Sequence, residues 1–237
     1  MNKVGFDIFI KMLGELIEFI VNDFDPEYIL EVRAIGGFSM IIHKRLGEIS
    51  GPREESRDID SLTKDYPDKI IDKIMEIGEK YGADDADGWL NNHWNRTKNF
   101  NEEFEFFIKW KVLEEVSFSN IVIYYADLES LFMFKIRALD NRIELAHLEP
   151  REQDIIDVVS ITRAFGIKSF DEIPNEQIKR TIPYFPHAVN FLIDNNIIGG
   201  TKLLTGNKSR TKFEDTEYGK KLKSQAEEYN NGTRAAD

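Results

Sequence analysis

The sequence predicts a protein of the α+β class, in which a mixed first domain is followed by a helical second domain. Strand patterns, which are runs of branched and aromatic residues or alternations of polar and apolar residues, are confined to roughly residues 29–125. After residue 127 the apolar residues recur mostly at helical spacing. Such segregation of strands and helices is typical of α+β proteins. We therefore expect domains at 1–126 and 127–237.

In the first domain, apolar residues between Phe6 and Ile20 recur at helical spacing and predict an amphipathic helix. The next expected elements are a strand at 29–35, a helix at 38–46, a strand at 56–62, a helix at 67–81, a loop at 82–101 and strands at 104–112 and 120–125. His43, in the second of these helices, is expected to face solvent. The second domain is expected to contain helices at 128–141, 152–165, 174–182, 187–196 and 214–229.

The composition indicates a globular chain and excludes several classes of function. Of the 237 residues, 41% are hydrophobic and 31% are charged, and the formal net charge is −12. This charge disfavours non-specific coating of nucleic acid. The absence of cysteine excludes disulfides, thiolate zinc sites and cysteine nucleophiles. The sequence has neither a run of about 18 apolar residues nor signal-peptide features, so we expect a cytoplasmic protein without a membrane partner.

The first candidate binding element is Gly36-Gly37, at the junction between a strand and a helix. Glycine allows the backbone to approach a phosphate closely, and the helix that follows presents unpaired N–H groups. Ser39 adds a hydroxyl group that can donate a hydrogen bond. Taken alone, a diglycine turn is more often only a turn.

The second candidate element is Asp58-Ile59-Asp60. Alternate residues of a strand point to the same face, so the two Asp Cα atoms are expected to lie about 6–7 Å apart with Ile59 directed into the core. Two carboxylates at this distance repel by about 2–3 kcal/mol at an effective dielectric constant near 20. A divalent cation removes this cost, and Mg²⁺ prefers one or two carboxylates together with substrate phosphates. A solvated edge strand is the alternative interpretation.

Together, Gly36-Gly37, a helix and Asp58-x-Asp60 resemble the signature of the DNA polymerase β-like nucleotidyltransferase superfamily. Trp89-Leu90-Asn91 resembles the "WLN" element of a branch close to abortive-infection toxins of the AbiEii type. Further similar segments are Ile121-Val122-Ile123, Asp127 to Leu131, Lys135-Ile136 with Ala138 and Arg142, Asp154-Ile155-Ile156-Asp157, and Phe165-Gly166-Ile167 with Asp171. The similarity covers roughly residues 30–185.

The resemblance implies a polymerase β-like core and transfer of a nucleoside monophosphate from an NTP, with pyrophosphate leaving. It implies that the glycine turn holds the triphosphate and that Asp58 and Asp60 hold Mg²⁺ or Mn²⁺. It also implies that Lys135 contacts phosphates and that Asp154 orients Lys135 or the attacking group. The implied acceptor is a tRNA or another macromolecule such as a protein, with small molecules such as aminoglycosides as an alternative, and a cognate antitoxin is an implied partner.

The sequence also departs from the family pattern. The usual Arg-x-Thr-x-Asp becomes Glu54-Glu55-Ser56-Arg57-Asp58, so that either Arg53 or Arg57 is left to meet a phosphate or to pair with Asp58. Of the two, Arg57 is the one that we expect at the nucleotide site. A third strand carboxylate is not obvious, and Glu103 and Glu105 are only candidates. Two alternatives therefore stay open: a degenerate nucleotidyltransferase fold that binds a nucleotide or a partner without catalysis, and an unrelated interaction protein.

Overall fold

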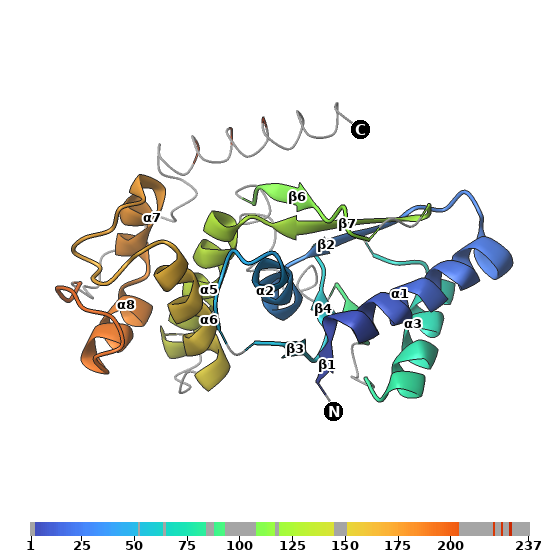
Figure 1. Ribbon diagram of the computed structural model, residues 1–237, viewed down its shortest axis with the longest axis horizontal. Coiled ribbons are helices and arrows are strands. Elements are labelled where there is room, and N and C mark those ends of the chain that lie inside the picture. Colours follow the sequence, from blue (N-terminus) through green and yellow to red (C-terminus); the bar gives the residue numbers. More distant parts are fainter. Residues whose placement is uncertain are drawn as a thin grey trace. The chain divides into compact units, whose positions relative to one another are not determined.

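The computed structural model describes residues 3–51, 53–63, 65–83, 88–92, 108–116, 119–144 and 151–203, together with Lys220, Ser224 and Glu228. The chain forms two compact units, Met1–Arg45 with Arg53–Asp127 and Leu46–Pro52 with Leu128–Asp237. Helices and small sheets are both present, which is consistent with the α+β class (Figure 1). Within the described residues, no helix is both long and apolar enough to cross a membrane.

The first unit combines helices with short strands. Its elements are β1 (Val4–Gly5), α1 (Phe6–Phe19), a π-helical turn (Ile20–Phe24), β2 (Leu30–Ala34), α2 (Gly36–Arg45), β3 (Glu55–Ser56), β4 (Ile59–Asp60), α3 (Asp68–Tyr81), β5 (Leu90–Asn91), β6 (Trp110–Val112) and β7 (Ile121–Ala126). β7 pairs in parallel with β2 and antiparallel with β6. β1 pairs antiparallel with β3, and β4 pairs in parallel with β5.

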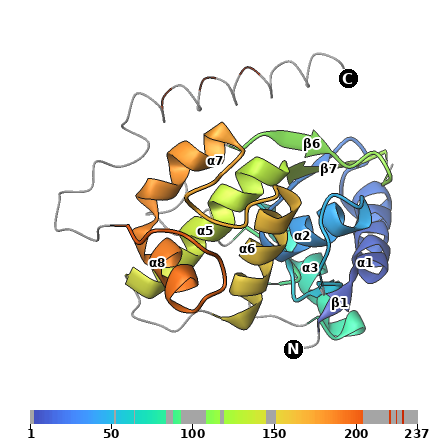
Figure 2. The same ribbon diagram turned by 60° about the vertical axis from the view of Figure 1, so that its left-hand side comes forward.

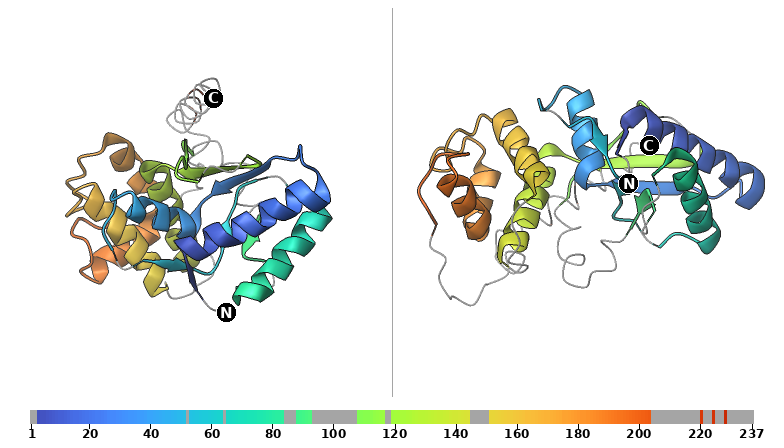
Figure 3. Two further views of the ribbon diagram at one scale, coloured as in Figure 1. Left: turned by 45° about the vertical axis from the view of Figure 1, so that its right-hand side comes forward. Right: turned by 90° about the horizontal axis from the view of Figure 1, so that it is seen from below.

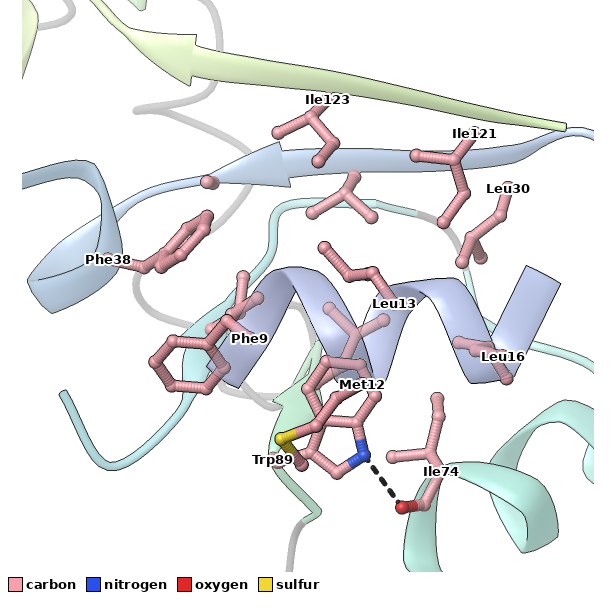
Figure 4. Packing of buried hydrophobic residues seen from close by; sticks show 14 of the residues in the cluster. Phe9, Met12, Leu13, Leu16, Leu30, Phe38, Ile74, Trp89, Ile121 and Ile123 are labelled. Carbon is pink, nitrogen blue, oxygen red and sulfur yellow. Dashed lines mark hydrogen bonds between the residues drawn. The ribbon is translucent and has the colours of Figure 1, made fainter. Parts of the chain in front are cut away.

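The core of this unit lies between α1, α3 and one face of the β2–β7–β6 sheet (Figure 3). Leu13 on α1 points toward the strands that carry Leu30 and the isoleucines of β7, and Leu16 belongs to the same buried cluster (Figure 4). Trp89 is fully buried beneath α1 and donates its indole N–H to the backbone oxygen of Ile74, 2.8 Å away. Burial of these apolar side chains stabilises the unit by the hydrophobic effect, and the indole bond anchors the residue that precedes β5.

The second unit is helical in its described part (Figure 2). Its elements are α5 (Leu128–Glu144), α6 (Glu152–Ala164), α7 (Glu176–Thr181), a short 3₁₀ helix (Ile182–Tyr184) and α8 (Pro186–Asp194). α5 packs against the three other α-helices. Asp140 on α5 is fully buried and accepts a hydrogen bond of 2.9 Å from the backbone N–H of Ala188 in the first turn of α8. A carboxylate at this place satisfies one of the N–H groups that a helix start leaves unpaired.

Several sequence-based boundaries differ from the structure. The strand expected at 56–62 is divided, because β3 pairs with β1 whereas β4 pairs with β5. The segment expected to be a loop contains β5, and α2 begins at Gly36 rather than after the glycines. The expectation for His43 is wrong, because its side chain is fully buried and its Nε2 donates to the backbone oxygen of Ala126, 2.8 Å away. Residues 104–107 and most of the helix expected at 214–229 lie outside the described residues.

Candidate functional site

The diglycine turn and Asp60 meet in the first unit at Gly36. This residue has φ of +62°, a conformation that glycine adopts without strain. A Cβ atom added to Gly36 would lie 2.5 Å from Oδ2 of Asp60. A side chain at position 36 would therefore require the Asp60 carboxylate to move, in addition to straining the backbone.

Backbone pairing accounts for this approach. The N–H of Ile35 donates to the oxygen of Asp60 at 2.9 Å, and the N–H of Leu62 donates to the oxygen of Arg33 at 3.0 Å. An antiparallel bridge also joins Ala34 to Ser61. The chain after β4 thus runs beside the end of β2, so that Asp60 lies where β2 turns into α2.

The second glycine of the turn packs against an arginine. A Cβ atom on Gly37 would overlap Nη2 of Arg53 and Oγ of Ser56. Arg53 Nη2 also lies 3.4 Å from Ser56 Oγ, within hydrogen-bond distance. Arg57, the arginine expected at the nucleotide site, is exposed and adjoins Asp58 in the sequence. Of the two arginines considered from the sequence, Arg53 is thus the one that lies at the glycine turn.

The two aspartates flank a core residue. Ile59 is fully buried, whereas Asp58 and Asp60 are partly exposed. Asn91 on β5 is buried and donates a hydrogen bond from Nδ2 to Oδ2 of Asp58 at 3.1 Å. Asn91 belongs to the Trp-Leu-Asn element, whose Trp89 and Leu90 lie in the core. Sequence reasoning did not identify Asn91 as a partner of Asp58.

Buried hydroxyl groups fix the chain that follows the aspartates. The Ser61 hydroxyl accepts the backbone N–H of Arg33 at 3.1 Å and lies 3.0 Å from the Thr63 hydroxyl, which donates to the Tyr66 hydroxyl at 2.8 Å. Burial raises the pKa of Tyr66 to about 12. Tyr66 therefore stays protonated at neutral pH and serves as a hydrogen-bonding group rather than as a base.

Ser39 lies in the interior of the first unit rather than at its surface. Its side chain is fully buried, and its Oγ has no hydrogen-bond partner among the described residues. An unsatisfied buried hydroxyl costs about 1–3 kcal/mol. The role of Ser39 as a nucleotide ligand stays a prediction.

In the second unit, Lys135 is buried in an ion pair. Its Nζ lies 2.6 Å from Oδ2 of Asp157, and the two side chains are 9% and 0% exposed. Gln153 donates a hydrogen bond of 3.0 Å to the other oxygen of Asp157. Asp154, which was expected to orient Lys135, instead lies 3.6 Å from Nε of Arg142 at a partly exposed position. The carboxylate that contacts Lys135 is therefore Asp157 and not Asp154.

The carboxylates of Asp58 and Asp60 are the candidate ligands for a metal ion in the first unit. Asp60 provides a partly exposed carboxylate beside the glycine turn, and Asp58 provides a second one two residues earlier; two carboxylates suit Mg²⁺ bound together with phosphates. Among the described residues, no three His, Asp or Glu side chains gather closely enough to hold a metal ion by themselves. Glu103 and Glu105 lie outside the described residues.

Comparisons with protein-family models, with curated proteins and with solved structures each found no match to this chain. The functional interpretation therefore depends on the geometry of the chain itself and on the resemblance of its motifs.

A glycine substitution tests the approach of Asp60 to α2. We expect Gly36→Ala to lower the free energy of unfolding by more than Gly47→Ala does. Both glycines have positive φ, at +62° and +72°, but a Cβ on Gly47 meets nothing within 4 Å. Gly47→Ala should therefore cost only the backbone strain of about 1–2 kcal/mol, and Gly36→Ala should cost more because the Asp60 carboxylate would also have to move.

Urea denaturation of both variants measures this difference. Equal losses of stability would mean that the Asp60 carboxylate does not lie against Gly36 in solution.

Proposed function

We propose that the protein is a Mg²⁺-dependent nucleotidyltransferase that moves a nucleoside monophosphate from an NTP to an acceptor hydroxyl. The observation that carries this proposal is the contact of Asp60 with Gly36, two residues 24 positions apart in the sequence. A carboxylate beside a glycine turn at a helix start brings together a ligand for a cation and donors for a phosphate.

The residues of the first unit have distinct roles in this proposal. Asp58 and Asp60 would hold the ion, which when bound would neutralise the phosphate charge and polarise the α-phosphate. The N–H groups at the start of α2 and the Arg53 guanidinium would hold the triphosphate. The acceptor hydroxyl gives its proton to solvent water and its oxygen attacks the α-phosphorus, the bond to the β-phosphate oxygen breaks, and pyrophosphate leaves. Positioning and charge neutralisation account for most of the catalysis.

The identity of the acceptor is suggested only by the motif resemblance, which favours tRNA or a protein. The same resemblance suggests a toxin-like role with a cognate antitoxin.

The proposed transfer is tested by incubating the purified protein with Mg²⁺, each α-labelled NTP in turn, and total cellular RNA and protein. We expect label in one of the two fractions and release of pyrophosphate. Absence of label in both fractions with all four NTPs, with Mn²⁺ in place of Mg²⁺ as well, would contradict the proposal.

A second candidate is a degenerate nucleotidyltransferase fold that binds a nucleotide or a partner without catalysis. The observation that favours it is that no three His, Asp or Glu side chains cluster among the described residues. The two candidates differ in turnover, so binding has to be measured separately from transfer.

Thermal unfolding with Mg²⁺ and each NTP provides this measurement. We expect one NTP at a hundredfold excess over its Kd to raise Tm by about 5–10 °C, because ligand binding to the folded state adds about 2.7 kcal/mol. A shift without label transfer favours the binding module. Absence of any shift up to millimolar NTP would contradict the transferase and the nucleotide-binding form of the second candidate, and would favour a module that binds a partner.

A further inference from the structure

We propose that Asn91 is a positioning residue that sets the ion preference of the Asp58–Asp60 pair by holding Asp58 in one-oxygen coordination. This inference rests on the proposed function, because it concerns the same two carboxylates. It goes beyond that function because it states that one hydrogen bond makes the site prefer Mg²⁺ and Mn²⁺ over Ca²⁺. That bond is the 3.1 Å contact from Asn91 Nδ2 to Asp58 Oδ2.

The pairing of β4 with β5 places Asn91 beside the aspartates. Asp60 and Asn91 are partners in the parallel register, and residues paired in this way point to the same face of a sheet. Backbone bonds of 2.7 Å from Ile59 to Trp89 and of 2.8 Å from Ser61 to Asn91 fix this register. Asp58 is two residues from Asp60, so its side chain extends from the same face as Asn91.

The surroundings hold the Asn91 amide in place. Its side chain is buried, with the residue only 5% exposed, and the preceding Trp89 is anchored through its bond to Ile74. Removing a buried amide would leave Oδ2 of Asp58 without this donor. Hydrogen bonds of this type orient the ligands of a metal, and their loss typically costs 10–100-fold in metal affinity.

Ion preference follows from the coordination that this bond permits. Because Oδ2 accepts the amide hydrogen, that oxygen has less negative charge to offer a cation, so the bond favours coordination through Oδ1 alone over bidentate coordination by Asp58. Mg²⁺ and Mn²⁺ suit octahedral sites with oxygen ligands, whereas Ca²⁺ takes more ligands and commonly binds a carboxylate through both oxygens. The bond therefore favours the smaller ions over Ca²⁺.

The experiment compares Asn91→Ala with Asn92→Ala, a matched control. Asn92 is the next residue, is 6% exposed, and donates a bond of the same 3.1 Å to a carboxylate, that of Asp65, outside the pair. Mn²⁺ binding to the full chain is measured by electron paramagnetic resonance in the presence of a non-hydrolysable NTP analogue, and Ca²⁺ binding is measured by its competition with Mn²⁺.

We expect Asn91→Ala to weaken Mn²⁺ binding by about tenfold or more and to weaken Ca²⁺ binding less, so that the preference for Mn²⁺ falls. We expect Asn92→Ala to leave both affinities unchanged. If Asn91→Ala does not fold, Asn91→Gln replaces it, because Gln keeps the amide but displaces it from Asp58 by one methylene.

Three outcomes separate this inference from the proposed function. If the Asn91 variant binds Mn²⁺ as tightly as wild type does, and Ca²⁺ as tightly as wild type does, the inference alone is overturned. Parallel losses for both ions, with an unchanged preference, would also overturn it, because a merely structural role predicts that result. Failure of the wild-type protein to bind Mn²⁺ at all would overturn the proposed function together with the inference.

Discussion

We expect the replacement of Asp58 or Asp60 by asparagine to reduce the proposed nucleotide transfer to less than about one thousandth of the wild-type rate. The reason is electrostatic, since a bound divalent ion contributes several kcal/mol of charge stabilisation and each 1.4 kcal/mol corresponds to tenfold in rate. Asparagine retains the shape of the side chain but loses the charge that holds the ion. The measurement is the initial rate of label transfer from the preferred NTP to the labelled fraction.

Asp65→Asn is the control for this experiment. Asp65, like Asp58, accepts a hydrogen bond of 3.1 Å from a buried asparagine, but it does not form part of the aspartate pair. We expect Asp65→Asn to retain transfer. The Asp58 and Asp60 variants should also retain the fold, because removing one of two neighbouring charges relieves repulsion in the absence of an ion. Transfer that survives in the Asp58→Asn, Asp60→Asn double variant would refute the enzymatic proposal.

Local patterns were sufficient to predict the principal elements of the fold. The helical spacing of apolar residues predicted α1 and α3, and the branched and aromatic run at 120–125 predicted β7, each to within about two residues. The alternation in Asp58-Ile59-Asp60 correctly predicted a buried Ile59 between two more exposed carboxylates. These features succeed because they depend on neighbours within a few residues.

Contacts between distant segments could not be predicted in the same way. The bond from Asn91 to Asp58 depends on the parallel pairing of β4 with β5, and β5 is too short to produce a strand pattern. His43 was assigned to solvent because its own helix does not reveal the Ala126 carbonyl that accepts its hydrogen bond. Local sequence specifies which residue types are available, whereas strand pairing and helix packing decide which of them meet.

The partner of Lys135 illustrates the same limit. Asp154 and Asp157 are three residues apart and share one helix face, so spacing alone does not distinguish them. The packing of α5 against α6 brings Asp157 to Lys135 and leaves Asp154 with Arg142. The Lys135–Asp157 ion pair is therefore buried, and removing one of its two charges is expected to change the stability of the protein strongly.

Replacing Lys135 by methionine lowers the free energy of unfolding by about 3–5 kcal/mol, because it leaves a buried carboxylate without its cation. Asp157 is fully buried, and Gln153 continues to donate a hydrogen bond to it after the change. Urea denaturation at pH 7 measures the loss. The loss should become smaller as the pH is lowered, because a buried carboxyl without a cation binds a proton more readily than the same group in the unfolded chain.

Arg142→Met is the matched control, since it removes the cation of a partly exposed pair on the same two helices. Exposed and partly exposed pairs contribute about 0–1 kcal/mol, so we expect a correspondingly small loss. A loss for Lys135→Met no larger than that for Arg142→Met would contradict the burial of the Lys135–Asp157 pair.

The double variant Lys135→Met, Asp157→Leu separates a structural role of Lys135 from the phosphate contact that the motif resemblance implies. Replacing both partners of a buried pair by apolar residues is often neutral for stability, so we expect the double variant to recover most of what Lys135→Met loses. If Lys135 also binds phosphates, the recovered protein will still fail to show the rise in Tm with the preferred NTP. If the pair serves only the fold, nucleotide binding returns together with stability, and the assignment of Lys135 to the nucleotide site is wrong.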